Sequence, residues 1–264
     1  MRRPHGPRRR APGRPAWPPG GRHGPRPLCH HPPVPSRLPS ALVARWDPRV
    51  FLPRLPQLLV GLVFFGVGIA LMAAAGVGLG PWEVLNQGIA RHTGLAMGTV
   101  SILLGVPILL LWIPLGEYPG IGTALNVLVI GTATNLALPL LTTPGELPLQ
   151  LAMMLAGVVT IGLGSGLYLG THLGPGPRDG LMTGIHARWG WSIRRARTLV
   201  EVTVLVIGFL LGGTVGIGTL VFAFGIGPVV QAFLRFLDHE TRASIARSDP
   251  DLAEELAGPG TVGE

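Results

Sequence analysis

Three features of the sequence predict an all-α integral membrane protein with six transmembrane helices, arranged as a 3+3 inverted repeat. Long apolar runs with few charges begin at Leu58 and continue to about residue 237. The stretch 57–140 recurs 96 positions later, at 153–236. Arginine is concentrated in the segments that would lie on one side of the membrane. Apolar runs of about 20 residues match the thickness of a bilayer, so the sequence excludes an ordinary soluble domain.

The internal repeat has no gap and covers most of the apolar part of the chain. Of its 84 aligned positions, 25 are identical, and 11 of these are glycines. Segment 78–83 aligns with 174–179 and shares the pattern Gly-x-Gly-Pro-x-acid. A duplicated membrane unit is a frequent plan of transporters and channels, whose binding sites lie between the two halves. The sequence therefore predicts a site between the repeats.

Six segments have the length and apolar character of a spanning helix, about 17–25 residues each. The predicted spans are 57–76, 97–115, 120–141, 151–171, 195–213 and 217–237. Two shorter and more polar segments, 81–92 and 177–189, follow the first span of each half. Each begins at the proline of the repeated Gly-x-Gly-Pro and is either a re-entrant helix or an interfacial helix packed on the bundle.

The distribution of arginine predicts that both termini lie in the cytoplasm. Residues 1–54 carry 12 Arg and one acid, and residues 172–197 carry five Arg. The loops predicted outside carry a single one, Arg91. This is a positive-inside pattern. Each half has an odd number of spans, so the second half must be inserted upside down relative to the first. The use of arginine for all 21 basic residues suggests a GC-rich bacterial genome, which places the protein in a bacterial plasma membrane.

The ends of the chain are predicted to be cytoplasmic tails. Residues 1–40 hold 12 Pro and 9 Arg and too little apolar surface for a core, which is typical of disorder. A later translation start, near Leu42, Val43 or Val50, is an alternative explanation of this tail. A short helix is expected at 249–256. The predicted organisation is a tail at 1–54, membrane repeats at 55–141 and 151–237, and a tail at 238–264.

No enzyme, metal or nucleic-acid function is predicted. Nothing beyond the arginine-rich tail supports nucleic-acid binding. The cluster Cys29-His30-His31 is too short to indicate a metal site, and the single cysteine excludes an internal disulfide. The sequence contains no nucleophile–base arrangement, P-loop or zinc signature, so no cofactor is expected.

The strongest candidate site lies at the starts of the two short segments. Pro81 and Pro177 suit the first turn of a helix, where the missing N–H costs nothing. The free N–H groups of a helix start favour anions, and Arg178 adds a full positive charge at one of them. The predicted substrate-binding residues are Trp82, Glu83, Asn86, Gln87, Arg178, Asp179 and Thr183, with Thr123, Asn126 and Thr219 from the last span of each half.

Structural explanations compete with each of these functional ones. Glu83 and Asp179 are common capping residues, and Arg178 could simply pair with Asp179. Thr123, Asn126 and Thr219 either line a cavity or bond a neighbouring helix. Glu201 is the one acid within a continuous apolar span. It is a candidate for coupling transport to an ion or proton, but an ion pair with Arg197 or Arg178 would explain it equally.

The motifs also carry a family resemblance. Segments 80–88, 119–126, 174–184 and 212–219 resemble the YczE-type bacterial integral membrane proteins, a group related to the YitT-like family. The resemblance covers about residues 57–237. It implies a polytopic protein of the cytoplasmic membrane, and it implies no particular activity.

Two functions follow as hypotheses. The first is a secondary transporter or permease that moves a small anionic or amphoteric solute through a cavity between the inverted repeats. The alternative is a non-transporting membrane scaffold or regulatory partner of a biosynthetic or export system. The expected partners are the lipid bilayer, a small-molecule solute, and a second copy of the chain or another membrane protein.

Overall fold

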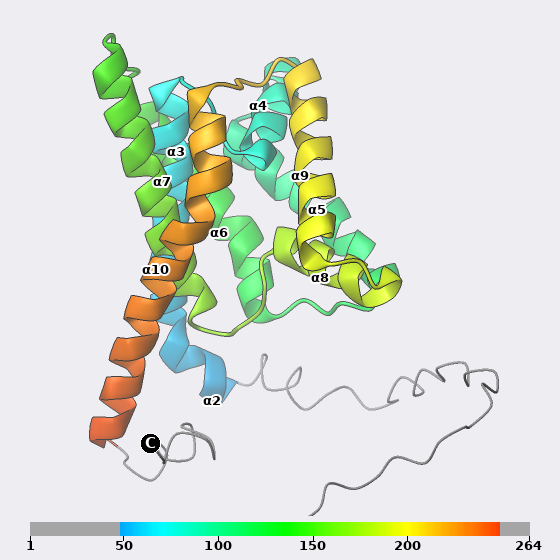
Figure 1. The fold of residues 1–264 in the computed structure, drawn as a ribbon, viewed down its shortest axis with the longest axis vertical. Coiled ribbons are helices and arrows are strands. Elements are labelled where there is room, and N and C mark those ends of the chain that lie inside the picture. Colours follow the sequence, from blue (N-terminus) through cyan, green and yellow to red (C-terminus); the bar gives the residue numbers. More distant parts are fainter. Residues whose placement is uncertain (1–47, 249–264) are drawn as a thin grey trace, which may run out of the picture. The chain divides into compact units, whose positions relative to one another are not determined.

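A computed structural model describes residues 48–248, and helices joined by loops and turns are the regular structure of this part of the chain (Figure 1). Eight of its helices, α3 to α10, are longer than ten residues. The elements are α2 (Pro48–Phe51), η1 (Leu52–Arg54), α3 (Leu55–Ala75), α4 (Pro81–Thr93), α5 (Met97–Leu115), α6 (Ile121–Ala137), η2 (Leu138–Leu140), α7 (Leu147–Leu169), α8 (Pro177–Trp189), α9 (Ile193–Leu210) and α10 (Ile217–Ser248).

Five helical stretches of the described chain are long and apolar enough to cross a membrane. They are Leu52–Ala75, Met97–Leu115, Ile121–Leu140, Leu147–Leu169 and Ile217–Phe236. The remaining predicted span, 195–213, forms α9, which ends earlier, at Leu210. Helix α9 is not among the five because its first half carries several charges, including Arg197 and Glu201. Sequence and structure therefore agree on a multi-pass helical membrane protein, and the sixth span stays a prediction.

The boundaries of the other elements differ from the expected ones by a few residues. Helix α7 begins four residues before the predicted 151, because Pro148 suits a first helical turn. Helix α10 continues to Ser248, well past the predicted end at 237. The predicted helix at 249–256, the arginine-rich part of the tail before residue 48 and the cluster Cys29-His30-His31 lie outside the described residues.

Helices α3 to α10 pack as two groups (Figure 1). In the first group, α3 packs against α6 and α7, and α7 packs against α10. In the second group, α4 and α8 each pack against both α5 and α9. Helix α5 also packs against α6 and so joins the two groups. The short helices α4 and α8 therefore lie within the helical assembly, each between two longer helices.

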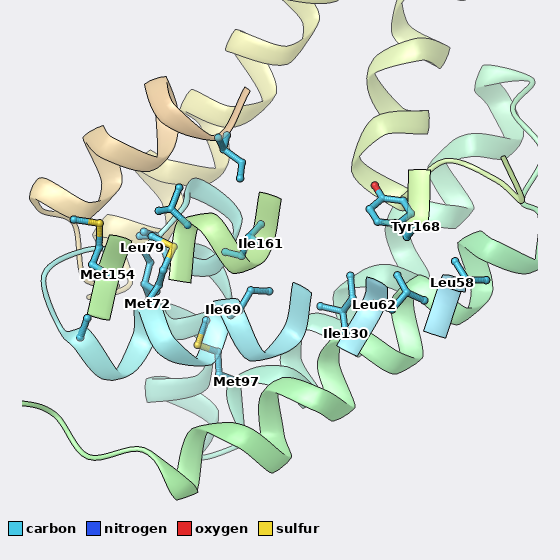
Figure 2. Packing of buried hydrophobic residues seen from close by; sticks show 14 of the residues in the cluster. Leu58, Leu62, Ile69, Met72, Leu79, Met97, Ile130, Met154, Ile161 and Tyr168 are labelled. Carbon is cyan, nitrogen blue, oxygen red and sulfur yellow. The ribbon is translucent and has the colours of Figure 1, made fainter. Parts of the chain in front are cut away.

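The centre of the first group is a close crossing of α3 and α7. A Cβ atom added at Gly61 would lie 2.9 Å from the carbonyl oxygen of Gly164, and one added at Gly68 would lie 2.8 Å from that of Gly157. Glycine allows this backbone contact, which membrane helices use because lipid provides no hydrophobic drive for association. Large apolar side chains pack along the crossing. Figure 2 shows Leu58, Leu62, Ile69 and Met72 of α3, Met154, Ile161 and Tyr168 of α7, and Ile130 of α6.

Contacts between the two halves of the chain come in reciprocal pairs. Two residues 96 positions apart are counterparts in the repeat. Gly61 contacts Gly164, the counterpart of Gly68, and Gly68 contacts Gly157, the counterpart of Gly61. The backbone N–H of Gly122 donates to Leu173 O at 3.1 Å. The same bond recurs with the halves exchanged, from Gly218 N–H to Val77 O at 2.9 Å. Each half therefore uses equivalent residues to contact the other.

The turns before α4 and α8 require glycine. Gly78 has φ 122° and Gly174 has φ 137°, in a region that other residues rarely adopt. A Cβ atom at Gly78 would lie 2.9 Å from Thr219 Oγ1, and one at Gly174 would lie 2.8 Å from Thr123 Oγ1. These turns bring the chain back into the protein immediately before each short helix begins.

Candidate functional site at the meeting of two helix starts

The first turns of α4 and α8 are built alike. An extended glycine, Gly80 or Gly176, precedes a proline at the first helical position. Proline has no N–H there to leave unpaired, and its fixed φ is suited to helix initiation. Each acid folds back over its own glycine, since a Cβ atom at Gly80 would lie 2.6 Å from Glu83 Oε2. Local sequence therefore determines where both short helices start.

The two helix starts are joined by an ion pair across 95 positions of sequence. Arg178 of α8 donates to Glu83 Oε1 of α4, whose side chain is only 4% exposed. The Arg178 guanidinium carbon also lies 5.2 Å from the ring centre of Trp82, in cation–π geometry. The expected alternative, a pair between Arg178 and Asp179, is not what forms. Asp179 instead accepts a hydrogen bond of 3.1 Å from the Tyr168 hydroxyl.

Within the described part of the chain, two buried side-chain atoms have no hydrogen-bond partner. They are Trp82 Nε1, a donor, and Glu83 Oε2, an acceptor. Burying such a group without a partner costs about 1–3 kcal/mol. Both residues belong to the first turn of α4. An unpaired donor at a helix start is the arrangement expected where a ligand supplies the missing acceptor.

A cavity of about 290 Å³ adjoins this meeting point. Helices α3 to α10 all contribute to its wall. The volume is close to the lower end of the range for small-molecule sites. Six of the predicted site residues line it, namely Trp82, Asn86, Asn126, Arg178, Asp179 and Glu201.

Three predicted site residues do not line this cavity, and their side chains form hydrogen bonds with backbone groups instead. Thr123 Oγ1 donates to Pro175 O at 2.8 Å. Thr219 Oγ1 accepts from Gly216 N–H at 3.2 Å, at the start of α10. Gln87 Oε1 accepts from Thr214 N–H at 2.6 Å. Each of these side chains ties a loop between helices to a helix.

The other two predicted residues outside the lining have different surroundings. Thr183 Oγ1 donates to Gly180 O, one turn earlier in α8, at 3.1 Å. Glu83 is not part of the lining, but its partner Arg178 is. Glu83 therefore contacts a residue of the cavity wall without lining the cavity itself.

Glu201 occupies the cavity wall together with Arg197. Arg197 Nε donates to Glu201 Oε1 at 2.9 Å, one turn apart on α9. Arg197 is half exposed, with 50% of its side chain accessible, and Glu201 is more buried at 26%.

Sequence reasoning missed five polar residues of the cavity wall. These are Ser101, Ser165, Tyr168, Arg197 and Gln231. The repeat offers a signal for one pair, because Ser101 and Arg197 are equivalent positions, 96 apart, and both line the cavity. Tyr168 has no polar counterpart, since Met72 stands at the equivalent position.

Comparison with known proteins confirms the family resemblance. Residues 52–235 match a family of unknown function, DUF6198. An uncharacterised protein of Haemophilus influenzae is 43% identical over 180 residues, covering 68% of this chain and 83% of that protein. The uncharacterised membrane protein YczE of Bacillus subtilis is 32% identical over 176 residues, covering 65% of this chain and 80% of YczE.

A third relative extends the comparison. The uncharacterised protein YyaS of Bacillus subtilis is 28% identical over 191 residues, covering 68% of this chain and 91% of YyaS. No solved structure matches the chain. The match over 52–235 contains both short helices and every residue that lines the cavity. This chain, a homologue of YczE, therefore belongs to the DUF6198 family of unknown function.

Proposed function

We propose that this protein is a secondary transporter or permease for a small anionic or amphoteric solute, which binds in the cavity between its two halves. The observation that carries the proposal is Trp82, which lines the cavity together with Arg178 and whose buried indole N–H has no hydrogen-bond partner in the described part of the protein. Both groups are donors only, so their ligand must present acceptor oxygens. A carboxylate or similar anion satisfies both at once.

The surrounding charges favour a ligand that also carries a donor or positive group. Asp179 and Glu201 line the same cavity as Arg178. Each acid has one hydrogen bond to a protein side chain, from Tyr168 and from Arg197. An ionised carboxylate accepts several, so both acids retain acceptor capacity. This arrangement suits an amphoteric solute. The proposal gives the cavity residues binding roles and no catalytic step.

The proposal includes six spans in two inverted halves, with α9 as the sixth. The reciprocal contacts between the halves support this arrangement. A twofold axis exchanges the two halves, so every contact between them must recur with the equivalent residues exchanged. The glycine pairs of α3 and α7 and the bonds of Gly122 and Gly218 satisfy this requirement. The membrane part then consists of residues 55–141 and 151–237.

The proposal also takes α4 and α8 as re-entrant helices. Glu83 is 3% exposed and Asn86 is 3% exposed, so the first turns of α4 face the protein interior. In α8 the equivalent acid, Asp179, is exposed, and the case for α8 rests on its equivalence to α4 in the repeat. A helix lying flat on the bundle would leave its polar side chains in water. By the positive-inside rule, α4 enters from the outside and α8 from the cytoplasm, with both chain termini cytoplasmic.

The first test is thermal stabilisation of the purified protein by a panel of amino acids, organic acids and phosphorylated metabolites. A ligand at 100 times its Kd is expected to add about 2.7 kcal/mol to the apparent stability. Arg178→Gln is expected to abolish the shift. If no compound stabilises the wild type, the scaffold function replaces this proposal, and partners that co-purify with the protein become the next measurement.

Trp82→Phe provides a cleaner test than a change of Arg178. It removes the unpaired N–H and keeps an aromatic ring, so no protein hydrogen bond is lost. We expect ligand binding to weaken at least about tenfold, since a hydrogen bond to a charged group contributes roughly 1.5–3 kcal/mol and about 1.4 kcal/mol is a factor of ten. Calorimetric titration of the two proteins with a ligand from the panel measures this change.

Trp112→Phe is the matched control. Trp112 is fully buried, and its Nε1 donates to Pro177 O at 3.1 Å. Trp112→Phe is expected to lower the stability of the ligand-free protein by at least about 1 kcal/mol and to change the Kd much less than Trp82→Phe does, because Trp112 does not line the cavity. Equal Kd values for wild type and Trp82→Phe would contradict the proposed role of Trp82.

A further inference from the structure

The repeat contains two equivalent interfaces between long helices, here called seams: one between α5 and α6 and one between α9 and α10. The seam between α5 and α6 is closed. Helices α5 and α6 meet at Gly98 and Gly131, where a Cβ atom on Gly98 would lie 2.0 Å from Gly131 O. Asn135 Oδ1 accepts from Gly98 N–H at 2.8 Å, and its amide donates to Thr99 Oγ1 at 2.9 Å. The backbone contact and the hydrogen bonds of Asn135 thus exclude lipid from this seam.

The counterpart seam, between α9 and α10, lacks both the close backbone contact and the asparagine hydrogen bonds. Arg194 replaces Gly98, and Gln231 replaces Asn135. Gly227, the counterpart of Gly131, has no atom within 4 Å of where a Cβ would lie. Helix α9 packs against α4 and α8, whereas α10 packs against α7. Gly227 and Gln231 of α10 line the cavity together with Arg197 and Glu201 of α9. The cavity therefore opens between α9 and α10.

The position of Gly227 decides what lies outside this opening. Gly227 is the eleventh residue of the 20-residue stretch Ile217–Phe236, which is long and apolar enough to span a membrane. At 1.5 Å per residue, each end of the stretch is about 15 Å away, which places Gly227 near the middle of the hydrocarbon. Leu220 and Phe224, on the same helix, are 61% and 80% exposed. Acyl chains, and not water, therefore lie outside the seam at Gly227.

The cavity wall changes character from one end to the other. Trp82 and Arg178 provide donors at the meeting of the helix starts. Along α10 the wall is mainly apolar, with Phe222, Ile226 and Val230, and Gln231 is its one polar side chain. A ligand that matches both parts has a polar acidic end and an apolar chain. A fully hydrated anion would leave the apolar wall unmatched.

We propose that the ligand of this cavity is a single-chain amphiphile with an acidic head group, which enters from the bilayer through the seam between α9 and α10. The head group binds the donors of Trp82 and Arg178, and the apolar chain lies against α10 and leaves past Gly227. This inference rests on the proposed solute site and adds the class of solute and its route of entry.

The test is binding of tritiated dodecanoate to the full-length protein in lipid nanodiscs, with empty nanodiscs subtracted. Gly227→Leu fills the opening and is expected to weaken binding at least tenfold. Gly225→Leu is the matched control, because Gly225 also has no atom within 4 Å of a Cβ but does not line the cavity. Gly225→Leu is expected to bind within twofold of wild type. Gly227→Val replaces Gly227→Leu if the leucine variant does not accumulate.

Competition identifies the ligand class. Unlabelled dodecanoate should displace the label, while dodecanol, dodecylammonium and butyrate should displace it at least tenfold less well. Equal displacement by butyrate, together with full binding by Gly227→Leu, overturns the amphiphile and the lateral route but leaves a site for soluble anions intact. Absence of specific dodecanoate binding to the wild type also overturns this inference, and the metabolite panel then decides the proposed function independently.

Discussion

Replacing Gly164 by alanine is expected to destabilise the protein by about 3 kcal/mol, although alanine is the better helix former. The added Cβ atom would lie 2.5 Å from Gly61 O and 2.6 Å from Phe65 N. Both are backbone atoms of α3, so no side-chain rotation can relieve the clash. Helices α3 and α7 would have to separate, and the core packed along their crossing would loosen (Figure 2).

The measurement is the midpoint of thermal unfolding in detergent, followed by size-exclusion chromatography of the heated sample. Gly225→Ala is the matched control, because its Cβ atom would meet nothing within 4 Å. That change is expected to be neutral or to stabilise by up to about 1 kcal/mol through helix propensity. If both variants unfold at the same temperature, the crossing of α3 and α7 is not as close as described.

Arg178→Gln is expected to cost about 3 kcal/mol, because it leaves the buried carboxylate of Glu83 without its charged partner. Glu83 is 3% exposed, and its second oxygen already lacks a hydrogen bond. Glu83→Gln is expected to cost less. Arg178 is 26% exposed on its side chain and keeps its contact with the Trp82 ring.

A double-mutant cycle separates the ion pair from the other effects of each change. The variant with both Glu83→Gln and Arg178→Gln is expected to be more stable than Arg178→Gln alone, with a coupling of about 1–3 kcal/mol. Unfolding midpoints of the four proteins in the same detergent give this value. Strictly additive effects would mean that Glu83 and Arg178 do not form a pair in the folded protein.

Much of the local structure could be predicted from the sequence. The starts of α4 and α8 at Pro81 and Pro177 agree with the prediction, because proline and the preceding glycine determine the first turn by local sterics. The lengths of the apolar runs located the spans, since these lengths are also a property of neighbouring residues in the chain. Helix α9 shows the limit of that criterion, since the charges of its first half remove the hydropathy signal that the other long helices have.

The candidate site could be predicted only in part. Trp82, Asn86 and Arg178 line the cavity, and the repeat had located the two helix starts to which they belong. Their role in binding stays a prediction. Gln87 and Thr123 were predicted for the same surface, yet their polar atoms bind Thr214 N–H and Pro175 O. A polar side chain in an apolar segment must find a partner, but the sequence does not say whether that partner is a ligand or the backbone of a distant loop.

The sequence by itself determined the helical segments, the register of the repeat and the first turns of the short helices. These depend on residues that are neighbours in the chain or on a pattern within it. Only the tertiary structure decided that Arg178 pairs with Glu83, that Trp82 keeps an unpaired donor, and that a Cβ atom at Gly227 would meet nothing within 4 Å. Each of these outcomes depends on which distant segments pack together, and equivalent sequence positions reached different packing in the two halves.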